Sequence, residues 1–252
     1  MFFMPIIRYH SSMFKNQLSN RLGPFNYSII EWLIIGVFIY FFVVLERMML
    51  GQLLILLISV VVHEVAHGYA ALICGDRTAL NQGRLTINPI RHIDPIGSVM
   101  LPLMLILSGS GFLFGWAKPV PVNTNQLNNP ADDMVKVAVA GPLSNITLAV
   151  IVSVAIKVIL AINPLLQVTY LWVFQLLGYA VVINIVLAVF NLIPIPPMDG
   201  SRILYRWLPY NARSFFDRIE PYGFLIIIVL AFFGFFSVIL NIICTPLIHL
   251  LL

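Results

Sequence analysis

The sequence predicts an all-α membrane protein, a polytopic helical bundle with about five crossings and one re-entrant or surface element. Of its 252 residues, 60% are apolar and 10% are charged, whereas a soluble globular domain carries roughly one quarter charged residues. Six apolar segments approach or exceed the roughly 20 residues that a helix needs to cross the hydrocarbon layer. We therefore expect a single membrane-embedded domain over residues 29–252, preceded by a basic flank over residues 1–28.

The first apolar segment, residues 29–45, follows a flank that contains Arg8, Lys15 and Arg21 and no acidic residue. Such a flank is typical of the cytoplasmic side of a membrane. The segment ends at Glu46-Arg47 without a small-residue cleavage site. We interpret it as a retained anchor rather than a targeting peptide.

The other apolar segments decide the number of crossings. If all six crossed from a cytoplasmic N-terminus, the arginine-rich connection 194–222 would lie outside, against the positive-inside tendency. Segment 97–115 is short and is interrupted by Ser108-Gly109-Ser110-Gly111. If it enters and leaves on one side, the loops that carry Arg77, Arg84, Arg91, Lys118 and the four arginines of 194–222 all become cytoplasmic, which leaves five crossings. The crossing segments after the first are then 51–74, 135–162, 168–193 and 223–251.

Two polar connections separate the second, third and fourth apolar segments. Residues 75–94 contain three arginines, and residues 116–133 are rich in Pro and Asn. Such stretches are typical of loops or short strands at the membrane surface, and the prolines interrupt the second one.

Charge and cysteine content exclude several functions. The formal net charge of +4 concerns membrane orientation, and the absence of a basic run interleaved with aromatic residues argues against a nucleic-acid partner. The bilayer is the expected surrounding. Cys74 and Cys244 are too few for a disulfide framework or a cysteine metal knuckle, so we expect buried free thiols.

The residues that indicate chemistry are His63, Glu64 and His67, inside the apolar segment 51–74. On a helix the two histidines lie one turn apart on one face, so both imidazoles can bind one zinc ion while Glu64 takes a proton from water. Ionisable groups inside a membrane helix cost several kcal/mol each unless they are paired, bind a metal or face a wet cavity. This pattern predicts a catalytic metal site.

Catalytic zinc usually has three protein ligands and one open position. The candidates for the third ligand are Asp76, His92, Asp94 and Asp199. Asp199 is favoured because it follows a proline-rich stretch at the end of an apolar segment, where broken backbone is tolerated only if it is buried or lines a cavity. Alternatively, Asp199 is a solvated turn residue before Gly200. His92 has the setting of an interfacial side chain.

Three motifs, in this order, resemble those of the site-2 protease family of intramembrane metalloproteases, peptidase family M50. They are His63-Glu64-x-x-His67, Gly141-Pro142-x-x-Asn145, and Asn191-x-x-Pro194-x-Pro196-x-x-Asp199-Gly200. The similarity spans about residues 51–204, and residues 114–123 look like the surface segment of the compact prokaryotic subgroup, which has no inserted peptide-binding domain. Taken by itself, Gly141-Pro142 is typical of a helix start or a kink.

The resemblance implies a zinc metalloendopeptidase that binds one zinc ion per chain through His63, His67 and Asp199. It implies that Glu64 is the general base and that Asn191 lies near the metal, where it orients the scissile peptide or stabilises its oxyanion. Asn145 is a further catalytic candidate, although it could equally tie helices together. The implied partner is a membrane-spanning protein substrate, and the implied location is the cytoplasmic membrane of a prokaryote.

Other functions remain open at this point. An intramembrane metal or proton transporter would explain His63 and Asp199 but not Glu64 at its spacing. A membrane di-iron oxidase would need several histidine boxes, whereas this chain has five histidines and one pair at ligand spacing. An inactive family member would not need all three ligands and the base.

Overall fold

The computed structural model describes residues 29–101, 104 and 117–252, with side chains from residue 48 onward. The chain divides into two units, Met1–Leu50 and Gly51–Leu252, and each is described by itself. The site and the motifs all lie in the second unit. The expected flank 1–28 lies outside the described residues, and so does most of the segment 97–115 that we expected to be re-entrant.

The described residues form helices and no strands, as the sequence predicts. The long helices are α2 (Ile29–Ile73), α5 (Pro130–Ile162) and α7 (Leu171–Asn191). Shorter elements complete the described fold: α3 (Thr78–Asn81), η1 (Pro89–His92), η2 (Pro95–Met100), η3 (Thr124–Gln126), α6 (Leu166–Thr169), α8 (Asp199–Tyr205), α9 (Tyr210–Ile219), η4 (Glu220–Tyr222), α10 (Gly223–Phe232), α11 (Phe235–Ile239), η5 (Leu240–Cys244) and α12 (Thr245–Leu251).

The structure differs from the predicted segments in two places and decides between two interpretations in a third. Segments 29–45 and 51–74 both fall within α2, because Glu46 and Arg47 are good helix formers and no proline separates the segments. Of the two interpretations of Gly141-Pro142, a helix start or a kink, the structure excludes the start, because the pair lies inside α5, which begins at Pro130. The segment 223–251 is not one helix, because Gly234 adopts a left-handed conformation with φ of 73° that ends α10.

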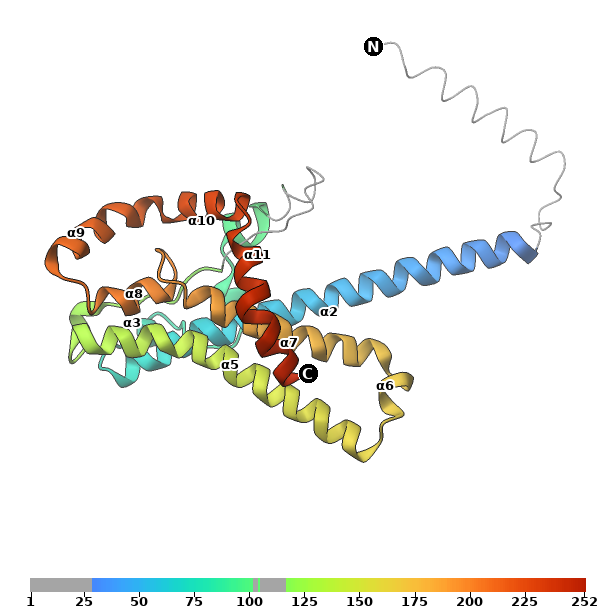
Figure 1. The fold of residues 1–252 in the computed structure, drawn as a ribbon. Coiled ribbons are helices and arrows are strands. Elements are labelled where there is room, and N and C mark those ends of the chain that lie inside the picture. Colours follow the sequence, from blue (N-terminus) through green and yellow to red (C-terminus); the bar gives the residue numbers. More distant parts are fainter. Residues whose placement is uncertain (1–28, 102–103, 105–116) are drawn as a thin grey trace, which may run out of the picture. The chain divides into compact units, whose positions relative to one another are not determined.

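Among the described residues, three helices have the length and hydropathy to cross a membrane: Met48–Ile73 of α2, α5 and α7. A fourth candidate is the pair Tyr210–Phe232 and Phe235–Leu251, whose two parts meet at 72°, a bend that can be followed from α10 to α11 in Figure 1. The outer face of α5 exposes large apolar side chains, among them Ile151, Val154 and Val158. A row of this kind suits contact with lipid better than contact with water.

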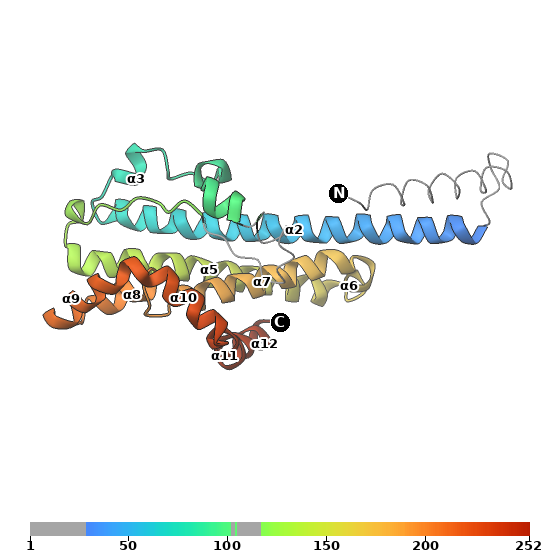
Figure 2. The same ribbon diagram turned by 90° about the horizontal axis from the view of Figure 1, so that it is seen from above.

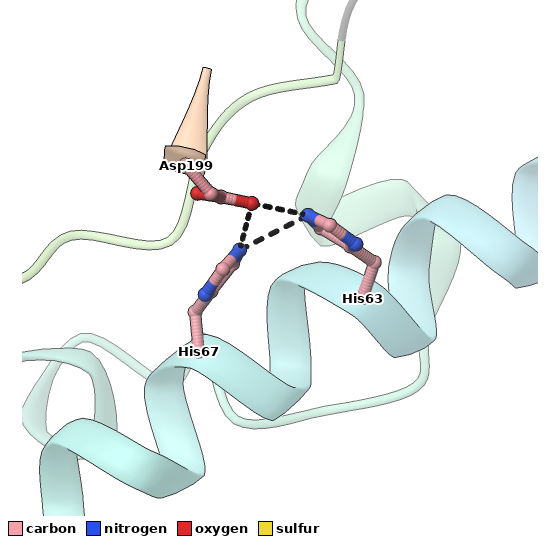
Figure 3. A group of neighbouring side chains, drawn as sticks. All are labelled: His63, His67 and Asp199. Carbon is pink, nitrogen blue, oxygen red and sulfur yellow. Dashed lines mark hydrogen bonds and ion pairs between the residues drawn. The ribbon is translucent and has the colours of Figure 1, made fainter. Parts of the chain in front are cut away.

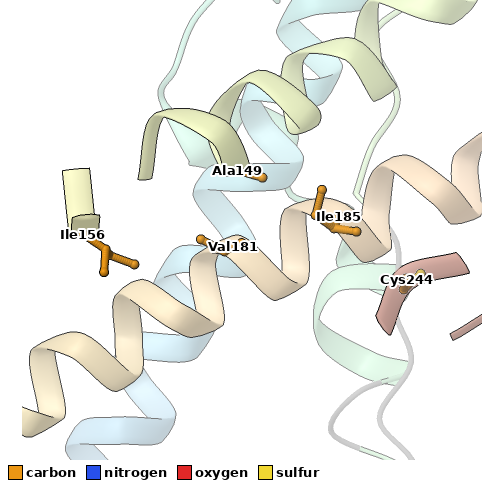
Figure 4. Packing of buried hydrophobic residues seen from close by; sticks show 5 residues of the cluster. All are labelled: Ala149, Ile156, Val181, Ile185 and Cys244. Atoms are coloured by element: carbon orange, nitrogen blue, oxygen red, sulfur yellow. The ribbon is translucent and has the colours of Figure 1, made fainter. Parts of the chain in front are cut away.

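Helices α5 and α7 pack side by side and form the centre of the second unit (Figures 1 and 2). Figure 4 shows the buried cluster at their contact, which Cys244 of η5 joins. Its members are Ala149, Ile156, Val181, Ile185 and Cys244. A small residue such as Ala149 lets two backbones approach closely, which is how helices associate where lipid is as apolar as the side chains. Both cysteines are free and buried, as predicted.

The chain reverses between α7 and α8 in a proline-rich turn that includes a cis peptide bond between Pro196 and Pro197. The reversal is tight: a Cβ atom on Gly200 would lie 2.2 Å from the carbonyl oxygen of Leu192. Glycine is therefore the residue that fits at this close approach. Helix α8 then packs against α5, which places its first residue, Asp199, opposite α2.

Candidate metal centre

His63 and His67 of α2 meet Asp199 of α8 in the second unit (Figure 3). The two Nε2 atoms are 3.0 Å apart. Oδ2 of Asp199 lies 3.2 Å from Nε2 of His63 and 3.3 Å from Nε2 of His67. Both histidines are buried. Among the described residues, these three form the group whose atoms are close enough together to hold one metal ion.

The hydrogen bonds around this group fit a bound cation. Nδ1 of His67 lies 2.7 Å from the carbonyl oxygen of Val137, which can only accept, so Nδ1 carries the hydrogen and Nε2 offers a lone pair. Oδ2 of Asp199 is buried without a hydrogen-bond donor. Acceptor atoms that face one another in this way repel unless a cation lies between them. Two imidazole nitrogens and one carboxylate oxygen are a donor set that zinc favours.

Glycine at position 141 makes room for this arrangement. A Cβ atom there would lie 2.3 Å from Nε2 of His67 and 2.6 Å from Nε2 of His63. Real Cβ atoms do not approach other atoms so closely, so helix α5 can pass the two imidazoles only with glycine at this position.

Glu64 faces the same cavity from the next position on α2. Its Oε2 accepts a hydrogen bond of 2.7 Å from the backbone N–H of Val120. The cavity has a volume of about 760 Å³, which is within the usual range for ligand sites. Its polar lining consists of His63, Glu64, His67, Thr124, Asn191, Asp199 and Arg202.

Residues 117–123 form an extended segment whose backbone is held by buried side chains. The guanidinium of Arg84 donates to the carbonyl oxygens of Lys118 and Pro119 at 2.8 and 3.2 Å. At the other end, Oδ2 of Asp76 accepts from the N–H of Asn123 at 2.7 Å. These contacts fix the position of the Val120 N–H that donates to Glu64.

The other candidates for a third ligand have structural roles instead. Burial raises the pKa of Asp76, but hydrogen bonds from Thr78 and Asn123 outweigh burial and hold the pKa below its usual range. Asp94 caps η2 by accepting from the N–H groups of Ile96 and Gly97. His92 is buried rather than interfacial, and its Nε2 lies 2.8 Å from the carbonyl oxygen of Thr86. Their polar atoms bond to nearby backbone, and none of the three belongs to the group of ligand atoms around the histidine pair.

The two asparagines of the motifs occupy different places. Asn191, at the end of α7, lines the cavity and donates one hydrogen of Nδ2 to the carbonyl oxygen of Leu187 at 2.9 Å. Asn145 is fully buried behind His63, with Oδ1 2.5 Å from Nδ1 of that histidine. It contacts the imidazole and does not line the cavity.

Sequence reasoning missed three residues around the histidines. The contact of Val137 is made by its backbone carbonyl, which a pattern of side chains cannot predict. Gly141 was interpreted as part of a motif and as a helix start or kink, but not as the position that makes room for the imidazoles. Asn184, which bonds to Asn145, could have been identified from the sequence, because it is an amide side chain within the apolar helix α7.

Comparison with known proteins agrees with this geometry. The model of the family described as "Peptidase family M50" matches residues 51–234. The chain belongs to peptidase family M50. The resemblance predicted from the three motifs is thus confirmed, and all the residues of the metal centre lie within the matched M50 region.

Relatives in this family carry names that refer to zinc. The chain is 39% identical over 176 residues to the "Putative zinc metalloprotease YwhC" of Bacillus subtilis, an alignment that covers 69% of this chain and 77% of the relative. It is 32% identical over 175 residues to the "Putative zinc metalloprotease Rip2" of Mycolicibacterium smegmatis, with coverage of 69% of this chain and 63% of the relative. No solved structure matches the chain.

Proposed function

We propose that this M50 protein is an intramembrane zinc metalloendopeptidase that hydrolyses peptide bonds of membrane-spanning proteins. The observation that supports it most is the meeting of His63 Nε2, His67 Nε2 and Asp199 Oδ2 beside Glu64, at a cavity among apolar helices. A transporter site would need neither a carboxylate at the position of Glu64 nor a cavity that accommodates a peptide.

His63, His67 and Asp199 would hold one zinc ion, which leaves the usual fourth position open. When bound, zinc polarises the scissile carbonyl and lowers the pKa of water towards neutrality. Glu64 accepts the proton of the attacking water and passes it to the leaving amine nitrogen. Because the Val120 N–H holds Oε2, Oε1 is the oxygen that transfers the proton.

Asn191 contributes to positioning of the substrate. One hydrogen of its Nδ2 is used on the carbonyl oxygen of Leu187, and the amide has two. The second hydrogen can be donated to the scissile carbonyl oxygen, where negative charge develops during attack. Asn145 acts behind His63 and does not touch the substrate.

The surroundings of the site suit a substrate that is itself embedded in a membrane. Several apolar helices suggest a multi-pass membrane protein, and the named relatives include bacterial ones. We place the protein in a prokaryotic cytoplasmic membrane, with a re-entrant path for residues 97–115 and four crossings, by α2, α5, α7 and the bent pair Tyr210–Phe232 and Phe235–Leu251, because segments 29–45 and 51–74, predicted to cross separately, form one helix. This topology puts the basic loops and the metal centre towards the cytoplasm.

The experiment that tests this function is the Glu64→Gln substitution. Glutamine keeps the size of the side chain and can still accept the Val120 N–H, but it cannot take the proton. Zinc content should stay at one per chain, while cleavage of membrane proteins falls by about three or more powers of ten. The measurements are metal analysis of the purified protein and comparison of the membrane proteomes of wild-type and variant cells.

Glu220→Gln is the matched control, because Glu220 is exposed, pairs with Arg202 and does not line the cavity. It should leave zinc content and cleavage unchanged. Near-normal cleavage by the Glu64→Gln protein would mean that Glu64 is not the general base. Identical proteomes in the wild-type and the Glu64→Gln cells would contradict a proteolytic function.

A further inference from the structure

We propose that Asn184 of α7 is a positioning residue that acts through Asn145 to fix the tautomer of His63, so that the Nε2 lone pair of His63 faces the metal centre. No motif includes Asn184. The inference rests on the part of the proposed function that assigns His63 to the metal, and it does not depend on proteolysis. It follows from hydrogen bonds that can be assigned in one direction only.

The assignment begins at Asn184, which is 2% exposed. Its Nδ2 lies 2.9 Å from the carbonyl oxygen of Ala180, and a carbonyl can only accept. The second Nδ2 hydrogen is donated to Oγ of Ser59 at 2.9 Å. This oxygen acts as the acceptor, because the hydroxyl donates its own hydrogen to the carbonyl oxygen of Ile55. The amide therefore cannot flip, and its Oδ1 must face Asn145.

The next step fixes Asn145, which lies between α2 and α7 with no exposed surface. Its Nδ2 donates to Oδ1 of Asn184 at 2.7 Å and to the carbonyl oxygen of Ser59 at 3.3 Å. Both partners are acceptors. The remaining atom, Oδ1, therefore points at Nδ1 of His63, 2.5 Å away.

The last step fixes His63. An amide oxygen only accepts, so Nδ1 of His63 carries the hydrogen and Nε2 is left with its lone pair. The same tautomer of His67 is set by the Val137 carbonyl alone. The two ligands thus differ: His67 depends on one backbone atom of α5, whereas His63 depends on a chain of two amides that crosses from α7 through α5 to α2.

A role in holding helices together is the competing explanation for these asparagines, since buried amides also tie membrane helices. The two roles make different demands. A tie needs any bond between helices, whereas the positioning role needs an acceptor at one atom, Oδ1 of Asn145. Substitutions that keep or remove this acceptor separate the two.

The test compares leucine and aspartate at both positions in the purified full chain. Asn145→Leu removes the acceptor and should weaken zinc binding about 10- to 100-fold, the usual cost of losing a partner of a metal-bound histidine. Asn145→Asp keeps an oxygen that accepts from Nδ1, and in its protonated form it can still donate to Oδ1 of Asn184, so its zinc affinity should fall clearly less than that of Asn145→Leu. Zinc affinity is measured by competition with a chelator.

The same pair of changes at position 184 tests the relay itself. Asn184→Leu should weaken zinc binding about tenfold, because the amide of Asn145 then keeps only the longer bond to the Ser59 carbonyl. Asn184→Asp retains the acceptor for Asn145 and should weaken zinc binding less than Asn184→Leu does. The Co²⁺ absorption spectrum of each variant reports whether the metal still has the same ligand set.

Ser153→Ala is the matched control on α5. The Ser153 hydroxyl donates to the carbonyl oxygen of Leu251 and so ties two elements away from the histidines. This variant should unfold at a lower temperature and bind zinc as the wild type does. Equal losses of zinc affinity in the leucine and aspartate variants, or no loss in either, would overturn the proposal.

If the leucine variants do not fold, the nitrogen-15 spectrum of His63 in the zinc-free wild type decides, with its signals assigned by their absence in His63→Ala. The Nδ1–H tautomer supports the relay, and a predominant Nε2–H tautomer contradicts it. A protein that binds zinc with the expected pattern but cleaves nothing would contradict the proposed function and leave the relay standing.

Discussion

At the scale of single residues, the candidate metal centre depends on the absence of a Cβ atom at position 141. Gly141 lies in the middle of α5, where glycine costs about 1 kcal/mol of helix stability relative to alanine. The structure gives the reason for this cost, since a methyl carbon would lie only 2.3 Å from Nε2 of His67 and 2.6 Å from Nε2 of His63. Local stability and site geometry therefore make opposite demands on position 141.

Gly141→Ala should abolish the metal centre while the helix persists. The methyl group must displace at least one imidazole, so we expect zinc affinity to fall by at least about 100-fold, more than the loss of an outer hydrogen bond would cost. Chelator competition measures the affinity, and circular dichroism reports the helix content. Gly178→Ala is the control, because a Cβ atom there meets no atom within 4 Å. Wild-type zinc affinity in Gly141→Ala would show that the imidazoles do not occupy these positions.

At the scale of elements, the segment 117–123 connects buried Arg84 to Glu64. Arg84 is only 7% exposed, and it donates to two carbonyl oxygens of this segment. Arg84 is not one of the candidate metal ligands, but its hydrogen bonds determine where the Val120 N–H lies. The orientation of Glu64, the proposed general base, is thus partly set by an arginine outside the long helices.

Arg84→Met should separate zinc binding from catalysis. Methionine fills the space of the arginine stem but leaves both carbonyls without a donor, so the segment loosens and Glu64 loses its fixed orientation. We expect full zinc content and cleavage reduced about 10- to 100-fold, in line with misplacement of a catalytic group. Metal analysis and cleavage of a substrate found by the proteome comparison measure the two quantities. Arg77→Met, at an exposed position, should change neither; equal effects of both variants would contradict this role of Arg84.

Hydropathy was sufficient to predict the helices that pack at the centre. The predicted segments 135–162 and 168–193 correspond closely to α5 (Pro130–Ile162) and α7 (Leu171–Asn191), because long apolar runs have few alternatives to a helix. The bend at Gly234 was missed because a single glycine in an apolar run is a weak signal. Spacing predicted the meeting of His63 with His67, but the partners of their Nδ1 atoms come from distant helices, which no local pattern records.

At the scale of the whole molecule, the basic loops predict the orientation in the membrane. Residues near Arg84, Lys118 and Arg206 should all lie on the cytoplasmic side, because the positive-inside tendency and the position of Asp199 agree. Single cysteines at exposed positions beside these residues can be labelled from either side, after Cys74 and Cys244 are replaced. Labelling near Arg206 from the outside alone would exclude this topology.

The division of the metal ligands between α2 and α8 has a consequence for biosynthesis. A membrane protein is made from its N-terminus onward, so the histidines of α2 leave the ribosome well before Asp199 does. Until the proline-rich turn has brought α8 back against α5, the chain has two of the three ligands and an unformed cavity. We therefore expect an incomplete or stalled chain to be inactive. Hydrolysis would begin only once the C-terminal part has inserted and folded.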